Sequence, residues 1–348
     1  MRTRSYKTSY SDLVALSQYQ STWIWAIAGL VVLALAPVVL GSHGLSILSV
    51  IFVMGIGILG LNLLTGVTGL ISLAHAGFLL IGAYAQAILT TDYHLPVWLA
   101  VFASGLVAAI ASLVVGVPSL RLKGLYLAIT TLAFTFIVRH VVLFAEGLTR
   151  GSEGMAVEPL VLMGYAVKSD LSFFYVALAM VILFVVLTLN IMRSRIGRAW
   201  LAVRDHDIAA RAMGISLMRY KLLAFMVCAF YTGVAGALVA LQTRYINVDT
   251  FSILVSIEAL AMVIVGGLGR VHGALLGTAL ILVLPELLSF GFSLAGDRFT
   301  TLLSDRIYEI KGLLYGVVIL AFLRLEPEGL AGIWRKVKRF WVHWPLSQ

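Results

Sequence analysis

The chain has 348 residues, of which 61% are hydrophobic and only 12% are charged, and its mean hydropathy is +1.02. Apolar residues make up about half of a soluble domain, so this composition excludes a soluble globular protein and indicates a polytopic membrane protein. In a membrane protein the net charge of +9 is less informative than the distribution of Lys and Arg on the two sides of the bilayer. One cysteine, Cys228, excludes an internal disulfide and a multi-cysteine zinc site.

Apolar runs follow one another along almost the whole chain. A helix needs about 20 residues to cross roughly 30 Å of hydrocarbon, and ten runs approach that length, so we predict an all-α, polytopic transmembrane helical bundle of about ten spans. The runs lie at residues 23–40, 45–64, 73–91, 96–117, 122–145, 172–192, 221–242, 253–268, 273–293 and 312–324. Residues 1–22 are expected to be a cytoplasmic segment without a cleaved signal peptide, followed by a membrane domain at 23–324 and a tail at 325–348.

Basic residues set the orientation of the bundle. With residues 1–22 inside, eighteen of the 25 Lys and Arg fall in cytoplasmic segments, six fall outside and Arg139 lies within a span. Cytoplasmic loops of membrane proteins carry such an excess of Lys and Arg. The bias therefore places both termini in the cytoplasm.

Two stretches between apolar runs are interrupted by glycines. Residues 62–78 contain Gly66, Gly69 and Gly77, and residues 265–274 contain a similar cluster. Broken helices of this kind point to a transport path, although small residues equally allow close helix packing, and we give each explanation even weight. The residues that we expect on a path are Asn62, Thr65, Ser72, His75, Glu258, Gly266 and Gly267.

Ionisable residues within the predicted spans are few, and each is costly in lipid. Glu258 lies near the outer end of its span, where it either lines a polar path or makes an interhelical hydrogen bond or ion pair, with Arg139 as a candidate partner. Arg139 and His140 are expected to extend toward the outer interface. Glu286 follows a proline and marks a candidate kink, and for His75 a packing role outweighs a ligand role.

The longest predicted external loop, residues 146–171, contains Gly151 and Gly154, which indicate a tight turn. A loop of this length is either a docking face for an external partner or a plain solvated connection. Both alternatives remain open from the sequence.

The predicted cytoplasmic loop Arg193–Lys221 carries seven Lys and Arg. From Trp200 to Gly214 it has no internal proline or glycine, and Asp207 precedes Arg211 by four residues, so we predict one helix that Gly214 ends. Small residues in this helix leave a slim surface that another backbone could approach. A helix lying on the membrane surface would show a similar pattern.

The tail at 325–348 combines basic and aromatic residues. Along one helical face and around it lie Trp334, Arg335, Lys336, Val337, Lys338, Arg339, Trp341 and Trp344. This pattern predicts an amphipathic helix on the anionic inner leaflet. Binding of nucleic acid is the weaker interpretation beside a final membrane span.

No motif of an enzyme occurs in the chain. It lacks a G-x-x-x-x-G-K-[ST] loop, an H-E-x-x-H pair and a G-x-S-x-G elbow. No motif therefore supports nucleotide binding by a P-loop or a hydrolytic activity. We expect no catalytic residue and no metal site. A stand-alone ion- or proton-coupled carrier, with Glu258 and Glu286 on its path, remains as an alternative to a transport subunit driven by a partner.

Several motifs in a fixed order resemble the permease subunits of branched-chain amino acid ABC importers, the LivM side of the LivH/LivM family. The motifs lie at residues 60–69, 72–78, 121–134, 148–155, 194–199 with 209–214 downstream, and 256–269. Asp207–Gly214 is similar to the coupling signature of importers, although the spacing after Asp207 departs from it. Arg150 stands where the family more often has a small residue, so the resemblance carries no expectation of how an external partner docks there. Ala74 stands where the family more often has glycine, so the same holds for the backbone of the first glycine break.

The resemblance implies a multi-pass permease of the bacterial inner membrane. It implies as partners a second, LivH-like permease subunit, two ATP-binding subunits that hold ATP and Mg, and an extracytoplasmic substrate-binding protein; the chain itself binds no cofactor and no nucleic acid. Branched-chain amino acids are the expected cargo, with urea or short amides as competitors. The residues expected to couple to the ATPase are Arg204, Asp207, Ala209, Ala210, Arg211 and Gly214.

Overall fold

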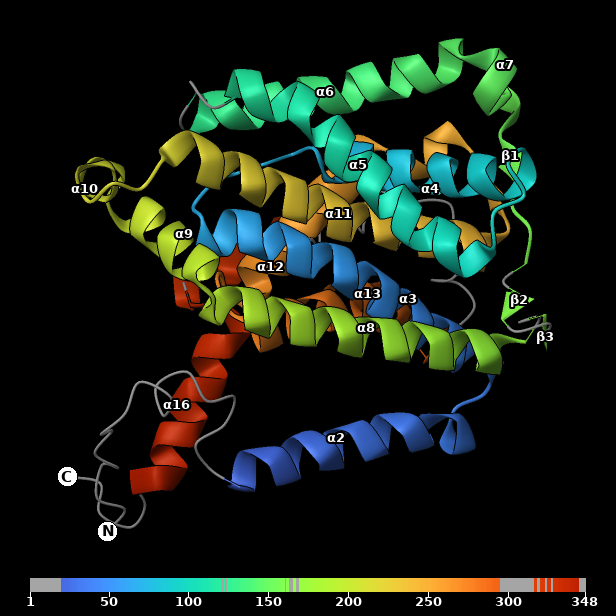
Figure 1. The fold of residues 1–348 in the computed structure, drawn as a ribbon. Coiled ribbons are helices and arrows are strands. Elements are labelled where there is room, and N and C mark those ends of the chain that lie inside the picture. The colour runs from blue at the N-terminus through green and yellow to red at the C-terminus, as the bar shows by residue number, and fades with distance from the viewer. Residues whose placement is uncertain are drawn as a thin grey trace.

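The computed structural model describes residues 20–119, 122, 124–159, 161–162, 165–166, 169–294, 316–317, 320–322, 324–326 and 328–343. The chain forms a bundle of long helices that run roughly along one axis (Figure 1). These helices are α2 (Gln20–Val39), α3 (Ser42–Leu61), α4 (His75–Thr91), α5 (Val97–Ser119), α6 (Leu125–Phe144), α8 (Asp170–Arg193), α11 (Leu217–Thr243), α12 (Ile253–Gly266) and α13 (Val271–Leu294). The predicted all-α class is confirmed.

Nine of the ten predicted apolar runs coincide with these nine helices. Most of the tenth run, 312–324, and most of the predicted segment 1–22 lie outside the described residues. By length and hydropathy, the helical stretches in the described ranges that can cross a membrane are Ser42–Val67, Val97–Pro118, Leu125–Phe144, Asp170–Arg193 and Leu217–Thr243. Shorter apolar helices lie at Ile27–Val39, Ile253–Gly266 and Val271–Leu287, so a count of ten spans stays a prediction.

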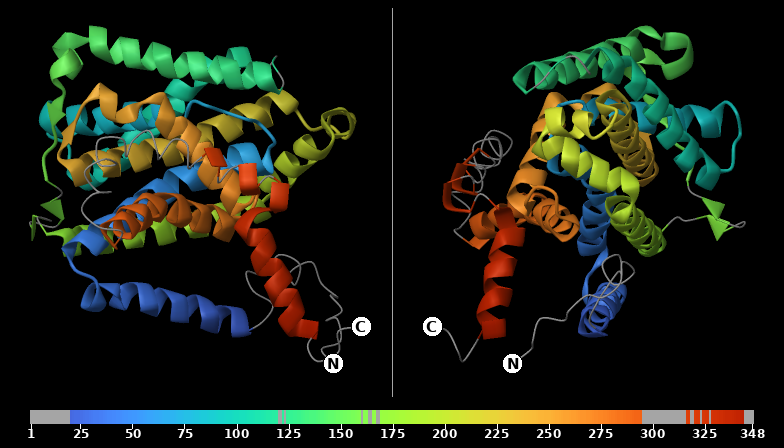
Figure 2. Two further views of the ribbon diagram at one scale, coloured as in Figure 1. Left: turned by 180° about the vertical axis from the view of Figure 1, so that it is seen from behind. Right: turned by 60° about the vertical axis from the view of Figure 1, so that its left-hand side comes forward.

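Helix α11 lies at the centre of the bundle and packs against α3, α4 and α5. Its inner residues are mostly small, and Gly233 and Gly236 bring its backbone close to α4 and α5, as small residues do between membrane helices. Tyr231 fills the gap toward α8 by an edge-to-face contact with Phe184 at 4.6 Å between ring centroids. Helix α2, in contrast, lies at the edge of the bundle (Figure 2) and exposes much of its apolar surface, although the Tyr175 hydroxyl of α8 donates to its Ala34 carbonyl at 3.2 Å.

Loops predicted for one side of the membrane gather at one end of the bundle. Helices α9 (Arg195–Asp205) and α10 (Asp207–Ala212) lie at this end, beside the α12–α13 connection (Figure 1). The opposite end carries α7 (Glu146–Thr149), η2 (Gly151–Glu153), η3 (Val248–Phe251) and four two-residue strands. This arrangement is the one that alternating spans require, and the end that bears α9 and α10 is the one predicted to be cytoplasmic.

The predicted external loop is folded onto its end of the bundle over residues 146–157. Strand β1 (Met155–Ala156) pairs antiparallel with β4 (Tyr245–Ile246), and the Tyr245 hydroxyl donates to the carbonyl of Glu153. Beyond it, β2 (Val161–Leu162) pairs with β3 (Tyr165–Ala166). Residues 146–157 are therefore an ordered part of this end of the bundle, and their use as a docking face stays a prediction.

The polar partner of Arg139 also lies at this end. Arg139 forms an ion pair with Asp249 of η3, so the pairing with Glu258 that the sequence suggested is not the one observed. The correction has a simple cause, because η3 folds back over the end of α6 and brings Asp249 to a side chain already expected at the interface.

Candidate functional site

The first glycine-interrupted stretch is a true break between two helices. Helix α3 continues into a π-helical turn, η1 (Asn62–Val67), and residues 68–74 are non-helical before α4 begins at His75. Three neighbouring hydroxyl groups satisfy the freed backbone: Leu73 N–H donates to Thr131 Oγ1 at 2.9 Å, Thr135 Oγ1 donates to the Leu73 carbonyl at 3.1 Å, and Ala76 N–H donates to Ser256 Oγ at 2.9 Å. Irregular backbone at membrane depth requires such protein partners.

The second break separates α12, which ends at Gly266, from α13, which begins at Val271. The two breaks meet at Asn62, whose side chain is fully buried. Asn62 Nδ2 donates to the Arg270 carbonyl at 3.1 Å, and Gly269 N–H donates to Asn62 Oδ1 at 2.8 Å. One amide thus uses a donor and its acceptor to join segments that lie more than 200 residues apart.

Gly66 completes this contact, because a Cβ at this position would overlap both Gly269 N and Asn62 Oδ1. Backbone approaches backbone here more closely than any residue with a side chain allows. We call the set Asn62, Gly66, Gly269 and Arg270 the break junction. The sequence predicted both breaks, but it contained no sign that they touch.

Arg204 of α9 reaches into the break junction. Its guanidinium donates to the Gly66 carbonyl, and its methylene groups lie against Gly69. The sequence placed Arg204 among residues expected to contact an ATPase; the structure directs its charged end toward the glycine break of its own chain. Helix α9 is thereby attached to both breaks.

The predicted single helix from Trp200 to Gly214 is divided at His206, which adopts an extended conformation with φ −153° and ψ 99°. The helix prediction is wrong at this residue, because the packing of α9 fixes its direction before α10 starts. Trp200 is fully buried, and its Nε1–H donates to the Tyr220 carbonyl at 2.8 Å, which holds α9 against α11. Helix α10 then begins at Asp207, with an acidic side chain in its first turn as the helix dipole favours.

Gly214 ends α10, as predicted. It adopts φ +83°, its N–H donates to the Arg211 carbonyl at 3.0 Å, and Ile215 N–H donates to the Ala210 carbonyl at 3.0 Å. This pair of bonds is the Schellman motif, which needs a residue in the left-handed conformation that glycine adopts without strain. The end of α10 is therefore fixed by local chemistry.

Helix α10 exposes apolar side chains at the end of the bundle. Ile208 is 81% exposed and Met213 is 84% exposed. The two adjacent alanines differ: Ala210 is buried, whereas Ala209 is exposed. Large apolar side chains on a charged loop mark a candidate interaction surface, and the structure assigns Ile208, Ala209 and Met213 to it.

Of the other predicted path residues, Thr65 lies within η1 beside Gly66, and the rest lie outside the break junction. His75 is buried at the start of α4, with Nδ1 3.5 Å from Thr232 Oγ1 and no hydrogen-bond partner for Nε2 among the described residues. Ser72 is buried and accepts from Ala74 N–H at 3.2 Å. Thr65 Oγ1 is a second buried atom without a partner in the described ranges. Glu258 lies half-buried in α12.

Gly266 and Gly267 of the expected path contribute backbone contacts. Gly266 packs directly on Gly273 of α13, and Gly267 packs on Glu328 and Ala331. Both therefore support the break and the helix that follows residue 328. No side chain at either position would fit without displacing backbone atoms.

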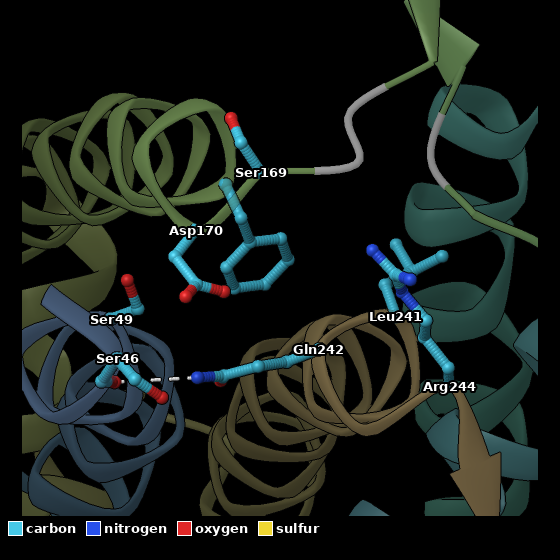
Figure 3. A pocket seen from close by; sticks show the side chains of 8 residues that line it. Ser46, Ser49, Ser169, Asp170, Leu241, Gln242 and Arg244 are labelled. Carbon is cyan, nitrogen blue, oxygen red and sulfur yellow. Dashed lines mark hydrogen bonds between the residues drawn. The ribbon is translucent and has the colours of Figure 1, made fainter. Parts of the chain in front are cut away.

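A small polar pocket, partly open to solvent, lies at the opposite end of the bundle, between α3, α8 and α11 (Figure 3). Its walls are formed by Ser46, Ser49, Ser169, Asp170, Phe173, Leu241, Gln242 and Arg244. Gln242 Nε2 donates to the Ser46 carbonyl at 3.3 Å across it. None of the predicted path residues lines this pocket, and no local pattern could reveal it because three separate helices supply its walls.

Replacement of Asn62 by leucine is expected to destabilise the protein by about 2–4 kcal/mol. The change removes two hydrogen bonds of about 1 kcal/mol each and leaves the Arg270 carbonyl and the Gly269 N–H without their partner. Thermal unfolding of the detergent-solubilised protein would measure the loss. Asn190→Leu is the matched control, since Asn190 is exposed on α8 and its replacement should change stability little; equal stability of both variants would contradict the role of Asn62.

The sequence model of a family described as "Branched-chain amino acid transport system / permease component" matches residues 44–323. The high-affinity branched-chain amino acid transport system permease protein LivM of Salmonella typhimurium is 36% identical over 272 residues, which are 71% of this chain and 64% of that protein. LivM of Escherichia coli is 36% identical over 289 residues, 75% of this chain and 68% of that protein.

A more distant relative matches along nearly its whole length. The permease protein BraD of Pseudomonas aeruginosa is 27% identical over 295 residues, 79% of this chain and 90% of that protein. The chain spans about two thirds of the length of the two LivM proteins. No solved structure matches the chain.

Proposed function

Because the chain belongs to the family of permease components of branched-chain amino acid transport systems, we propose that it is a membrane-spanning subunit of an ABC importer that moves branched-chain amino acids inward. In this proposal ATP and Mg are bound and ATP is hydrolysed by partner subunits, while the chain itself is non-catalytic. Its place is the bacterial inner membrane, which it crosses several times.

The observation that carries the proposal is the link between α10 and the two helix breaks. Helix α10 and the residue that follows it present exposed Ile208 and Met213, and α9, which packs on α10, is bonded through Arg204 to Gly66. A partner that pushed on α10 would therefore move the break junction, where Asn62 joins the two breaks. Such a direct connection is what a transporter powered from outside its own chain needs.

The proposed partners are a second, LivH-like permease, two ATP-binding subunits and an external substrate-binding protein. Support comes from the relatives, whose names describe permease proteins of high-affinity transport systems and include both LivM and LivH. The folded end formed by α7, η2 and the β1–β4 pair offers a shaped surface for the external protein. Urea or a short amide remains a second candidate cargo within the same mechanism.

The stand-alone carrier has less support. Of its two acidic candidates, Glu286 is about half exposed and lies 3.6 Å from His43 Nε2, so it does not line an enclosed path between the described helices. Glu258 lies half-buried on α12, eight residues before the second break begins at Gly266. A carrier that acts alone would require both to serve the cargo or the coupling ion.

Uptake by reconstituted vesicles distinguishes the two functions. Vesicles that hold the chain with its permease partner, the ATP-binding subunits and the binding protein should accumulate labelled leucine only when ATP is supplied on the cytoplasmic side. Vesicles with the chain alone should show no uptake, and Glu258→Gln should leave most of the ATP-driven uptake, because the proposed mechanism assigns no proton or coupling ion to Glu258. ATP-independent uptake by the chain alone that Glu258→Gln abolishes would overturn the proposal in favour of the carrier.

A further inference from the structure

Helix α16 (Gly329–His343) connects to the transport domain at the second break. The Gly267 backbone packs on Glu328 and Ala331, and Gly329 approaches Gly267 N and the Val265 carbonyl. Arg270 Nη1 donates to the Ala331 carbonyl at 3.1 Å, and its Nη2 lies 3.9 Å from Glu328 Oε2. The first turn of α16 is thus joined to the α12–α13 loop by backbone, hydrogen-bond and ionic contacts.

Two further ion pairs stiffen the start of this helix. Arg335 pairs with Glu328, and Lys336 pairs with Glu326. Both acidic partners precede α16, and residues 329–343 contain no Asp or Glu. The two pairs therefore neutralise the charges nearest the bundle, while the later part of the helix, with Lys338 and Arg339, keeps its basic sequence.

The direction of α16 differs from that of the other long helices. In Figure 1 and in both views of Figure 2 it runs across the bundle axis, at the end where α9 and α10 lie, and projects away from the bundle. A helix that crosses the axis of membrane-spanning helices at their end lies close to the plane of the membrane surface. Ile333 is 38% exposed and Trp334 is 61% exposed, and positions 334, 337 and 341 share one side of a regular helix.

We propose that α16 binds the anionic surface of the cytoplasmic leaflet and that this attachment holds the α12–α13 loop, and with it the break junction, in place. Charge complementarity selects this occupant, because a basic helix with tryptophan at the interface suits negatively charged headgroups. Because α16 contacts the α12–α13 loop, binding of lipid to α16 would restrict the position of this loop. Arg270 transmits it, since its side chain contacts α16 and its carbonyl accepts from Asn62.

A fluorescent label can report the position of α16 in the full-length chain. The single cysteine, Cys228, is buried, so a Val337→Cys variant carries one added cysteine for the attachment of a polarity-sensitive dye. The labelled protein is placed in nanodiscs of phosphatidylcholine alone or with phosphatidylglycerol added. We expect a blue shift of the emission with phosphatidylglycerol, reversal of the shift at high salt, and no dependence on ATP-binding subunits.

Charge variants make the test specific. Neutralising Lys338 and Arg339 together by glutamine should weaken the lipid-bound state about twenty-fivefold, from roughly fivefold for each charge near the surface. The control, Arg211→Gln with Arg219→Gln, removes the same charge from exposed positions outside α16 and should keep the shift. Equal emission in both lipids, or a shift that appears only when the ATP-binding subunits are present, would overturn the lipid site in favour of no partner or a protein partner.

Hydrogen exchange of residues 265–270 tests the connection to the loop. Gly269 N–H, which is bonded to Asn62, should exchange several-fold more slowly in nanodiscs with phosphatidylglycerol, and the Lys338/Arg339 double variant should lose this protection. Neither result depends on which solute is transported. Lipid-dependent emission at position 337 without any change in exchange at 265–270 would overturn the proposed link.

Discussion

Gly66→Ala is expected to reduce ATP-driven uptake at least tenfold. The added Cβ would overlap Gly269 N and Asn62 Oδ1, and neither can retreat freely, because Gly269 and Asn62 are bonded to each other. Extra volume in a tightly packed interior costs about 1–3 kcal/mol. Here the strain falls on the contact between the two broken helices, so we expect transport to fall even where the protein still folds.

The measurement pairs labelled-leucine uptake with the amount of folded transporter in the membrane. Gly29→Ala is the control, because Gly29 lies in α2 with no atom within 4 Å of an added Cβ, and its uptake should match that of the unaltered protein. Normal uptake by Gly66→Ala would show that the break junction does not have to be closed for transport. Loss of folded protein alone would confine Gly66 to a structural role.

Met213→Asp is expected to uncouple the transporter from its ATP-binding partners. Met213 is 84% exposed beside α10, and a charge in place of a large apolar contact at the centre of an interface costs about 2 kcal/mol or more, roughly thirtyfold in affinity. The binding protein and substrate should then no longer stimulate ATP hydrolysis, and uptake should fall at least tenfold. Stability of the isolated chain should change little, because the side chain has few contacts to lose.

Met218→Asp is the matched control for this prediction. Met218 is 58% exposed at the start of α11, at the same end of the bundle but outside the surface formed by Ile208, Ala209 and Met213, and its replacement should leave coupling intact. Ala209→Asp should act like Met213→Asp since Ala209 is exposed, whereas Ala210 is buried and Ala210→Asp would also disturb folding. Full stimulation of ATP hydrolysis in Met213→Asp would contradict α10 as the docking element.

Much of the membrane architecture could be predicted because it rests on local properties. Apolar runs located nine helices, since each run alone determines whether about 20 residues prefer hydrocarbon to water. The stop at Gly214 was predictable for a similar reason: the Schellman bonds involve residues only a few positions apart. The glycine clusters correctly marked two breaks, although nothing in either cluster states what lies opposite.

Errors arose where a neighbour distant in sequence decided the outcome. The helix expected from Trp200 to Gly214 divides at His206 because α9 is held against α11 by the Trp200–Tyr220 hydrogen bond. Arg139 pairs with Asp249 because η3 folds over the end of α6. In both cases local propensity was overridden by packing, which a single sequence does not display.

The sequence by itself determined that this protein is a polytopic helical membrane protein with a basic loop at 193–221, two glycine breaks and an amphipathic basic tail. Hydropathy, charge and glycine positions suffice for these features because each depends on short stretches of chain. Only the tertiary structure decided that Asn62 joins the two breaks, that Arg204 turns inward to Gly66, and that α16 is attached through Arg270. These contacts join residues 61 to 208 positions apart, and only the packing of the whole bundle brings such residues together.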